Sequence, residues 1–138
     1  MRAPDNSQTV PTALVFWIIW FSILSGLFII LFFAAGGIPR GTNAGEAPVG
    51  FVAIAGVLAT VSIGIRFLLI PRIQDPAKLM PAMIVGLALA EGIGMIAMFV
   101  VGKDLPQTRF SLFFASVSAV VVYAPFYVHS LQERRKMG

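Results

Sequence analysis

One acidic side chain, Glu91, lies near the middle of a long apolar run, where a carboxyl group is rare because its charged form is costly. It is the only charged residue between Leu79 and Val101. If that run is a helix across a bilayer, Glu91 lies about 16 Å from its start, at the centre of the hydrocarbon layer. A charged carboxylate at that depth costs about 2.5 to 3.5 kcal/mol on insertion scales, which favours the neutral acid facing protein or water. Such a carboxyl is suited to load and release a proton, or simply to fix helix packing by a hydrogen bond.

Hydroxyl side chains occur on the other apolar runs at the level of Glu91. Glu91 lies about 16 Å from the start of its run, and the same depth on each of the other three runs falls near two hydroxyl side chains. These candidate hydrogen-bond partners are Ser22, Ser25, Thr60, Ser62, Ser116 and Ser118. Arg66 lies roughly 10 Å nearer the helix end, so we expect no direct ion pair between it and Glu91.

Most other chemistry is excluded by the residue types present. The sequence has no Cys, its single His is His129, and no second carboxylate lies inside an apolar run. Disulfides, thiolate metal sites, His-based triads and intramembrane hydrolases are therefore excluded. We expect no enzymatic activity, no cofactor and no metal ion. The net charge of +4 comes from basic residues at the ends of apolar runs, so we also expect no nucleic-acid partner.

The composition identifies the solvent that surrounds these residues. The chain has 138 residues, of which 58% are hydrophobic and 12% charged, and its mean hydropathy is +0.90. A soluble domain has about a quarter of its residues charged, and this chain has too few to cover a surface in water. We therefore predict an integral, multi-pass protein of the cell (plasma or inner) membrane, with the lipid bilayer as its partner.

Four apolar runs are long enough to cross a bilayer, which takes about 20 helical residues. They cover residues 13–35, 49–70, 79–101 and 110–128. Polar connectors that contain Gly and Pro separate them. The runs predict an all-α, polytopic membrane protein. It would be a single membrane domain over residues 1–138, with four transmembrane helices in an antiparallel bundle and a basic tail at 129–138.

The distribution of Lys and Arg predicts the orientation of this bundle. One side carries Arg2, Arg66, Arg72, Lys78, Arg134, Arg135 and Lys136, and the other carries Arg40, Lys103 and Arg109. Because basic residues are enriched in cytoplasmic segments, we expect both termini and the tail in the cytoplasm.

Two stripes of small residues predict where helices pack closely. Small side chains recur every fourth residue on the second and third runs and let backbones approach each other. The stripes are Gly56, Thr60 and Gly64, and Gly86, Ala90 and Gly94. The first run is instead rich in Phe and Trp, which suits an outer position against lipid. Two glycine-rich faces also predict self-association or contact with other membrane subunits.

A polar connector followed by a helix with a central acid occurs within residues 50–101. The connector reads Arg-Ile-Gln-Asp-Pro-Ala-Lys from Arg72, and the helix reads Met-Ile-Val-Gly-Leu-Ala-Leu-Ala-Glu-Gly-Ile-Gly-Met from Met83. This region resembles the hairpin of the proteolipid (c) subunits of rotary ATP synthases and ATPases. The resemblance implies that Glu91 carries the transported proton or sodium ion and that copies of the chain assemble side by side. The connector is longer than the family's Arg-Gln-Pro, and the first and fourth runs lie outside the resemblance.

Two functions follow as predictions. In the first, Glu91 is a proton or cation site in a small membrane protein that is oligomeric or belongs to a larger complex. In the second, the chain is a non-catalytic structural or accessory subunit, and Glu91 only fixes helix packing.

Overall fold

The computed structural model describes residues 13–129 and residue 133, and it places this part of the chain in helices and connecting loops. The helices are α1 (Ala13–Ile29), α2 (Val49–Gly64), α3 (Pro76–Met95) and α4 (Pro106–Val122). π-helical turns extend the first three at Ile30–Ala34, Ile65–Leu69 and Ile96–Val100, and a 3-10 turn follows at Ile70–Arg72. Four spans of 22 to 24 residues result, each long and apolar enough to cross a membrane. The predicted all-α fold with four such helices is confirmed.

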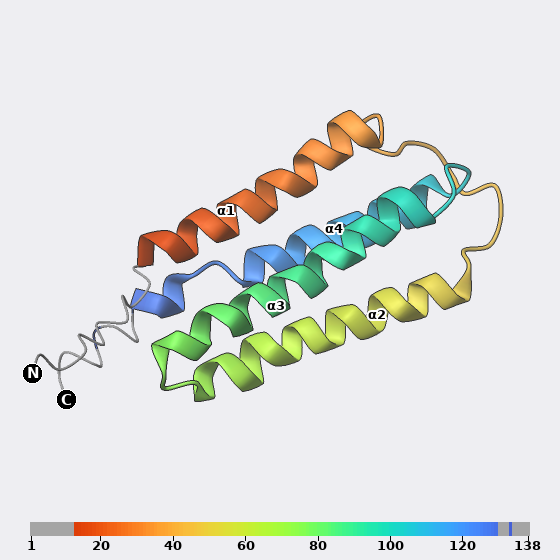
Figure 1. The fold of residues 1–138 in the computed structure, drawn as a ribbon. Helices are drawn as coiled ribbons and strands as arrows, with labels where there is room; N and C mark the ends of the chain where they lie inside the picture. Colours follow the sequence, from red (N-terminus) through yellow and green to blue (C-terminus); the bar gives the residue numbers. More distant parts are fainter. Residues whose placement is uncertain (1–12, 130–132, 134–138) are drawn as a thin grey trace, which may run out of the picture.

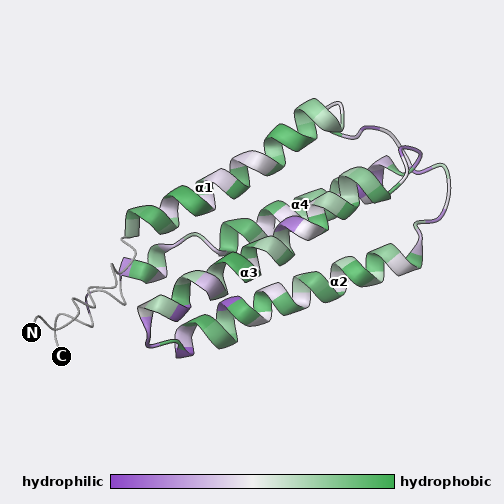
Figure 2. Cartoon of the chain, viewed as in Figure 1, coloured by the Kyte–Doolittle hydropathy of each residue, from purple (hydrophilic) through white to green (hydrophobic). Residues whose placement is uncertain are grey.

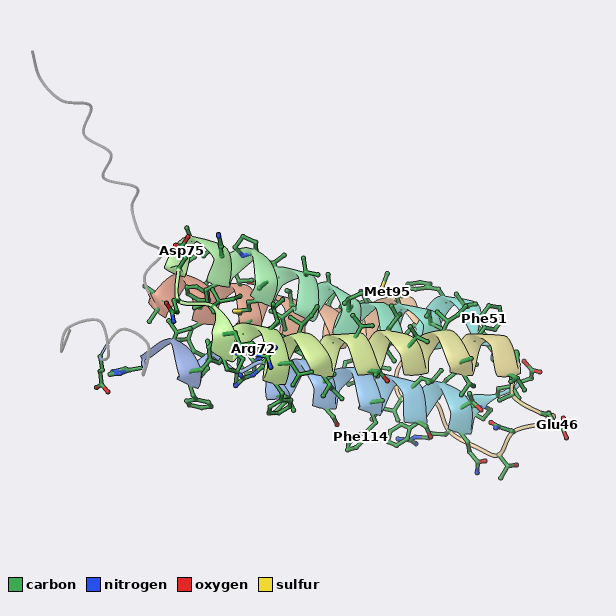
Figure 3. All side chains as sticks on the ribbon, turned by 90° about the horizontal axis from the view of Figure 1, so that it is seen from below. Glu46, Phe51, Arg72, Asp75, Met95 and Phe114 are labelled. Atoms are coloured by element: carbon green, nitrogen blue, oxygen red, sulfur yellow. The ribbon has the colours of Figure 1, made fainter. Side chains whose placement is uncertain are left out.

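The helices run up and down in sequence order, with α3 and α4 as a central pair. Figure 1 shows α1 and α2 flanking this pair on opposite sides. Seen from below, α2 lies in front of both α3 and α4 (Figure 3). The start of α1, the connector from α2 to α3 and the end of α4 share one end of the bundle (Figure 1). The loops at 36–48 and 101–105 lie at the opposite end of the bundle (Figure 1).

Bulky apolar side chains cover the outside of the bundle. Figure 2 shows hydrophobic residues along all four helices, while hydrophilic residues gather in the connectors. Phe33, Phe67 and Phe114 are among the exposed large side chains. An apolar surface of this extent fits contact with lipid. The first helix presents most of its Phe residues outward as expected, although Phe16 is buried.

Two helices begin earlier than their apolar runs, because their first turns are polar. α3 starts at Pro76, where the Asp75 carboxylate accepts a hydrogen bond from the amide of Ala77 at 3.0 Å. α4 starts at Pro106, and the amide of Gln107 donates to Oδ1 of Asn43 at 3.0 Å. Proline at the first turn and an Asp or Asn oxygen as cap are ordinary helix-start features. Hydropathy alone, which placed these starts at residues 79 and 110, does not detect them.

α4 also ends earlier than expected. It stops at Val122 instead of continuing to residue 128, and a further helical turn follows at 126–129. Pro125 has no amide hydrogen to donate, so the helical hydrogen bonding is interrupted before it. In a continuous helix the amide of Phe126 would donate to the carbonyl of Val122, four residues back. Here it donates to the carbonyl of Ala124 at 2.9 Å, so the Val122 carbonyl lacks its helical hydrogen bond.

The two small-residue stripes have different positions in the fold. Gly86, Ala90 and Gly94 of α3 are buried, and a Cβ at Gly94 would lie 2.8 Å from both Leu27 Cδ2 and Ser116 Oγ. On α2, Gly56 and Thr60 are exposed, Gly64 is half-buried, and no atom lies within 4 Å of a Cβ added at either glycine. The α2 stripe therefore makes no close contact within the described chain, and its contact with another chain stays a prediction.

Candidate functional site

Glu91 lies on α3 at the border between its packed face and its outer face. One turn away along the helix are the buried Leu87 and Gly94 on one side and the exposed Ala88 and Met95 on the other. Glu91 itself is half-buried. At 1.5 Å per residue it is about 13 Å from the Val100 end of its span, and so near mid-membrane if the helix crosses a bilayer. Its side chain therefore stands at the edge of the bundle, deep in the span.

The Glu91 carboxyl has no hydrogen bond or ion pair with any residue that the structure describes. The backbone carbonyl of the preceding residue, Ala90, accepts a hydrogen bond from the hydroxyl of Ser116 at 2.7 Å. Arg66 does not pair with it, in line with the difference in depth expected from the sequence. The carboxyl thus lies beside a tightly packed helix contact without taking part in it.

The six hydroxyls proposed as partners do not hydrogen-bond to Glu91. Ser22 and Thr60 donate to carbonyls one turn back on their own helices, Ile18 and Gly56, each at 2.8 Å. A hydroxyl on a helix always has such a carbonyl within reach, which is why depth matching alone overestimates bonds between helices. Ser25 is half-buried and Ser118 exposed, and neither forms a bond to Glu91.

The remaining two hydroxyls connect α3 to its neighbours through backbone carbonyls. Ser62 of α2 donates to the carbonyl of Gly86 at 2.9 Å, and Ser116 of α4 donates to the carbonyl of Ala90. Both serines are fully buried. Tyr123 adds a hydrogen bond to the carbonyl of Ser62, and its hydroxyl occupies the space where a Cβ at Gly86 would lie. These buried bonds hold the helices together without using the carboxyl.

Sequence reasoning missed a buried arginine at the opposite end of the bundle from Arg66. Arg109 precedes the apolar run at 110–128, but it lies in the first turn of α4 and is 5% exposed. Its Nε and Nη2 atoms donate to the carbonyls of Ala97 (3.1 Å) and Met98 (3.0 Å) in the last turns of the α3 span. Helix ends leave carbonyls unpaired, and a cation there also interacts favourably with the helix dipole. Pro106, as a helix-start signal, is the sequence feature that would place Arg109 in the helix, although it does not indicate burial.

Arg66 occupies the corresponding place at the interrupted end of α4. Its Nε atom donates to the carbonyl of Val122 at 2.9 Å, and its guanidinium carbon lies 4.2 Å from the centre of the Tyr127 ring. Nearby, Nε1 of Trp20 donates to the carbonyl of Val120 at 2.7 Å. Arg66 thus links the span that begins with α2 to the interrupted end of α4.

No cluster of three or more His, Cys, Asp and Glu side chains that would hold a metal ion is present among residues 13–129 and 133. Comparison with known families, with curated proteins and with solved structures finds no match to this chain. Function is therefore inferred from the side chains and their surroundings.

Proposed function

We propose that this chain is a small multi-pass membrane protein in which Glu91 binds and releases a proton, within an oligomer or a larger membrane complex. The observation that carries the proposal is the position of Glu91, half-buried deep in an apolar span with no partner in the described chain. A neutral carboxyl presents one O–H donor and acceptor oxygens. Left unsatisfied in hydrocarbon, such groups cost about 1 to 3 kcal/mol each, so a partner from outside the chain or water is favoured there.

The surroundings of Glu91 favour a proton over a metal cation. A dehydrated hard cation needs several oxygen ligands, as calcium and magnesium sites illustrate. The hydroxyls of Thr60, Ser62 and Ser116 donate to backbone carbonyls, and none is hydrogen-bonded to Glu91. Glu91 is the one carboxyl of α3, and among the described residues it belongs to no group of three or more His, Cys, Asp and Glu side chains that could hold a metal ion. A proton requires only the carboxyl oxygen itself.

Contact with a further membrane chain would complete this site. The exposed Gly56 and Thr60 on α2 give the bundle a second surface on which another helix can approach closely. The resemblance of residues 50–101 to rotary proteolipids, whose copies assemble side by side, adds to this proposal. By the distribution of Lys and Arg, we place the end that carries Arg72 and Lys78 in the cytoplasm of a cell whose plasma or inner membrane holds the protein.

The second candidate is a structural or accessory subunit without transport. It is favoured by the hydrogen bonds within the bundle, where Ser62, Ser116 and Arg109 are all buried and bonded. In this role Glu91 would stabilise the contact between this chain and another chain, because it makes no hydrogen bond to the other helices of the described chain.

Proton flux into liposomes separates the two candidates. We expect liposomes with the wild-type protein to acidify faster than protein-free ones when a potassium diffusion potential drives protons inward. Glu91→Gln, which keeps the shape but does not exchange a proton, should abolish that excess. Glu46→Gln, at an exposed carboxyl in the 36–48 loop, serves as the matched control and should leave the flux unchanged. Equal flux in Glu91→Gln and wild type would contradict the proposal, and no flux above protein-free liposomes would favour the accessory role.

A further inference from the structure

A second polar site lies where α4 is interrupted, and it is independent of Glu91. The carbonyl of Val122 has lost the partner that a continuous helix would provide, because the amide of Phe126 bonds to Ala124 instead. Arg66, in the π-helical turn that follows α2, donates a hydrogen bond to that carbonyl with its Nε atom. The guanidinium is thereby held at a fixed point of the bundle, on a span that is otherwise uncharged from Val49 to Ile70.

The contacts of Arg66 leave one edge of its guanidinium unused. Nε is bonded to the Val122 carbonyl, and the guanidinium carbon lies 4.2 Å from the centre of the Tyr127 ring and 5.6 Å from that of the Phe67 ring. The two terminal nitrogens, Nη1 and Nη2, form no hydrogen bond with the described residues. These nitrogens point their N–H groups in the planar fork that matches two oxygens of a phosphate or carboxylate.

No acidic side chain of the described chain neutralises this arginine. The ion pair that the described residues form is His129 with Glu133, at 3.3 Å. Asp75, at the same end of the bundle, caps α3 through the amide of Ala77. Arg66 is about 9 Å inside the Arg72 end of its span, where an unpaired cation in lipid is costly and recruits polar headgroups.

The surroundings of Arg66 favour a lipid as the source of the anion. Phe67 beside it is 58% exposed, and Phe126 next to the α4 interruption is 73% exposed. Both give apolar surface along which acyl chains pack. Arg72 and Lys78 are exposed at the same end and draw anionic headgroups toward it.

We propose that Arg66 binds the phosphate group of a phospholipid through its Nη1 and Nη2 edge, with Val122 and Tyr127 holding the guanidinium in place. The ligand class is a phosphate oxyanion, and phosphatidylglycerol is the suitable probe. Native mass spectrometry of the detergent-solubilised full chain, titrated with phosphatidylglycerol or with the phosphate-free diacylglycerol, measures the binding. Inorganic phosphate in excess is added in a separate arm to compare the lipid with a free anion.

We expect wild-type protein to retain phosphatidylglycerol and not diacylglycerol, and Arg66→Gln to weaken that retention about tenfold, the factor that corresponds to ~1.4 kcal/mol. Arg72→Gln removes an exposed arginine at the same end and should have little effect. Arg66→Lys keeps the charge but not the fork and should give an intermediate loss. It replaces Arg66→Gln as the deciding variant if the latter does not fold, with Arg72→Lys as its control.

Three results would overturn the proposal: equal retention of diacylglycerol, an unchanged affinity in the Arg66 variants, or an equal loss in the Arg66 and Arg72 variants. The last of these would show a general effect of surface charge. Displacement of the lipid by inorganic phosphate would overturn the lipid assignment and identify a free-phosphate site. Failure of inorganic phosphate to displace it supports the lipid.

Discussion

The small-residue stripes on α2 and α3 have the same spacing but opposite surroundings. Gly86 of α3 receives the Tyr123 hydroxyl, and Gly94 lies against Leu27 and Ser116. The α2 glycines face open space, and α2 packs instead through the buried Ala55 and Ser62. Small residues therefore permit close approach between helices, and a partner side chain that fits the space determines where it occurs. For α3 these partners are Tyr123 at Gly86 and Ser116 at Gly94, and each hydroxyl forms its hydrogen bond in the space that a larger side chain at the glycine would fill.

The largest effect is expected from filling the packed stripe. Gly86→Leu places a side chain where the Tyr123 hydroxyl lies and breaks its bond to Ser62. We expect a loss of about 3 kcal/mol in the free energy of unfolding, or failure to fold. Unfolding in mixed micelles with rising sodium dodecyl sulfate measures it, with Gly56→Leu on the open stripe as the matched control. Equal losses in the two variants would remove the distinction between the stripes.

A smaller loss is expected where a buried cation closes a helix end. Arg109→Met keeps much of the side-chain volume but leaves the carbonyls of Ala97 and Met98 without their donors. The expected loss is about 2 kcal/mol, the typical cost of leaving buried acceptors unpaired. The same titration should show almost no change for Arg40→Met, because Arg40 is exposed. A neutral result for Arg109→Met would mean that these carbonyls find other partners, such as water.

Removing one hydroxyl from the packed stripe should have a modest effect. Ser116→Ala deletes the 2.7 Å bond to the carbonyl of Ala90 beside Glu91. Hydrogen bonds between membrane helices average about 0.6 kcal/mol, and we expect a loss of that size. Ser118→Ala, on an exposed position two residues away, is the control and should not change stability. A loss well above that of a typical interhelical bond would show that Ser116 has a role beyond this contact.

The smallest effect on folding is expected from substitutions in the α2 stripe, which also test for contact with another chain. Gly56→Leu and Gly64→Leu together should change the unfolding free energy by less than about 0.5 kcal/mol, because surface substitutions rarely do more. If the α2 stripe receives a second copy or another subunit, the same substitutions should reduce association. Förster transfer between labelled chains in liposomes measures this. Unchanged transfer in a chain that self-associates would assign the contact to another face.

Much of the fold could be predicted from hydropathy, and most of the side-chain contacts could not. Four apolar runs fix four spans, since hydrocarbon tolerates only helices of sufficient length. The helix starts at Pro76 and Pro106 and the interruption before Pro125 depend on capping and on a missing amide, which are visible as residue types but not in hydropathy. The depth of Glu91 follows from counting along one helix.

The neighbours of Glu91 could not be predicted in the same way. They depend on the rotation of each helix about its axis, which brings Ser116 against the backbone of Ala90 and leaves the adjacent carboxyl at the edge. Arg109 was misassigned for a related reason, because its burial is a property of the end of the α3 span that accepts it.

Labelling with dicyclohexylcarbodiimide measures directly whether Glu91 is a neutral carboxyl within the membrane, because the reagent modifies neutral carboxyls in apolar surroundings. In membranes at neutral pH, we expect mass spectrometry to find the adduct on Glu91 in wild-type protein and none in Glu91→Gln, while Glu46 in its exposed loop stays unmodified. Absence of the adduct on Glu91 in folded wild-type protein, under conditions that label a known membrane carboxyl, would contradict the account of Glu91 as a protonated intramembrane site.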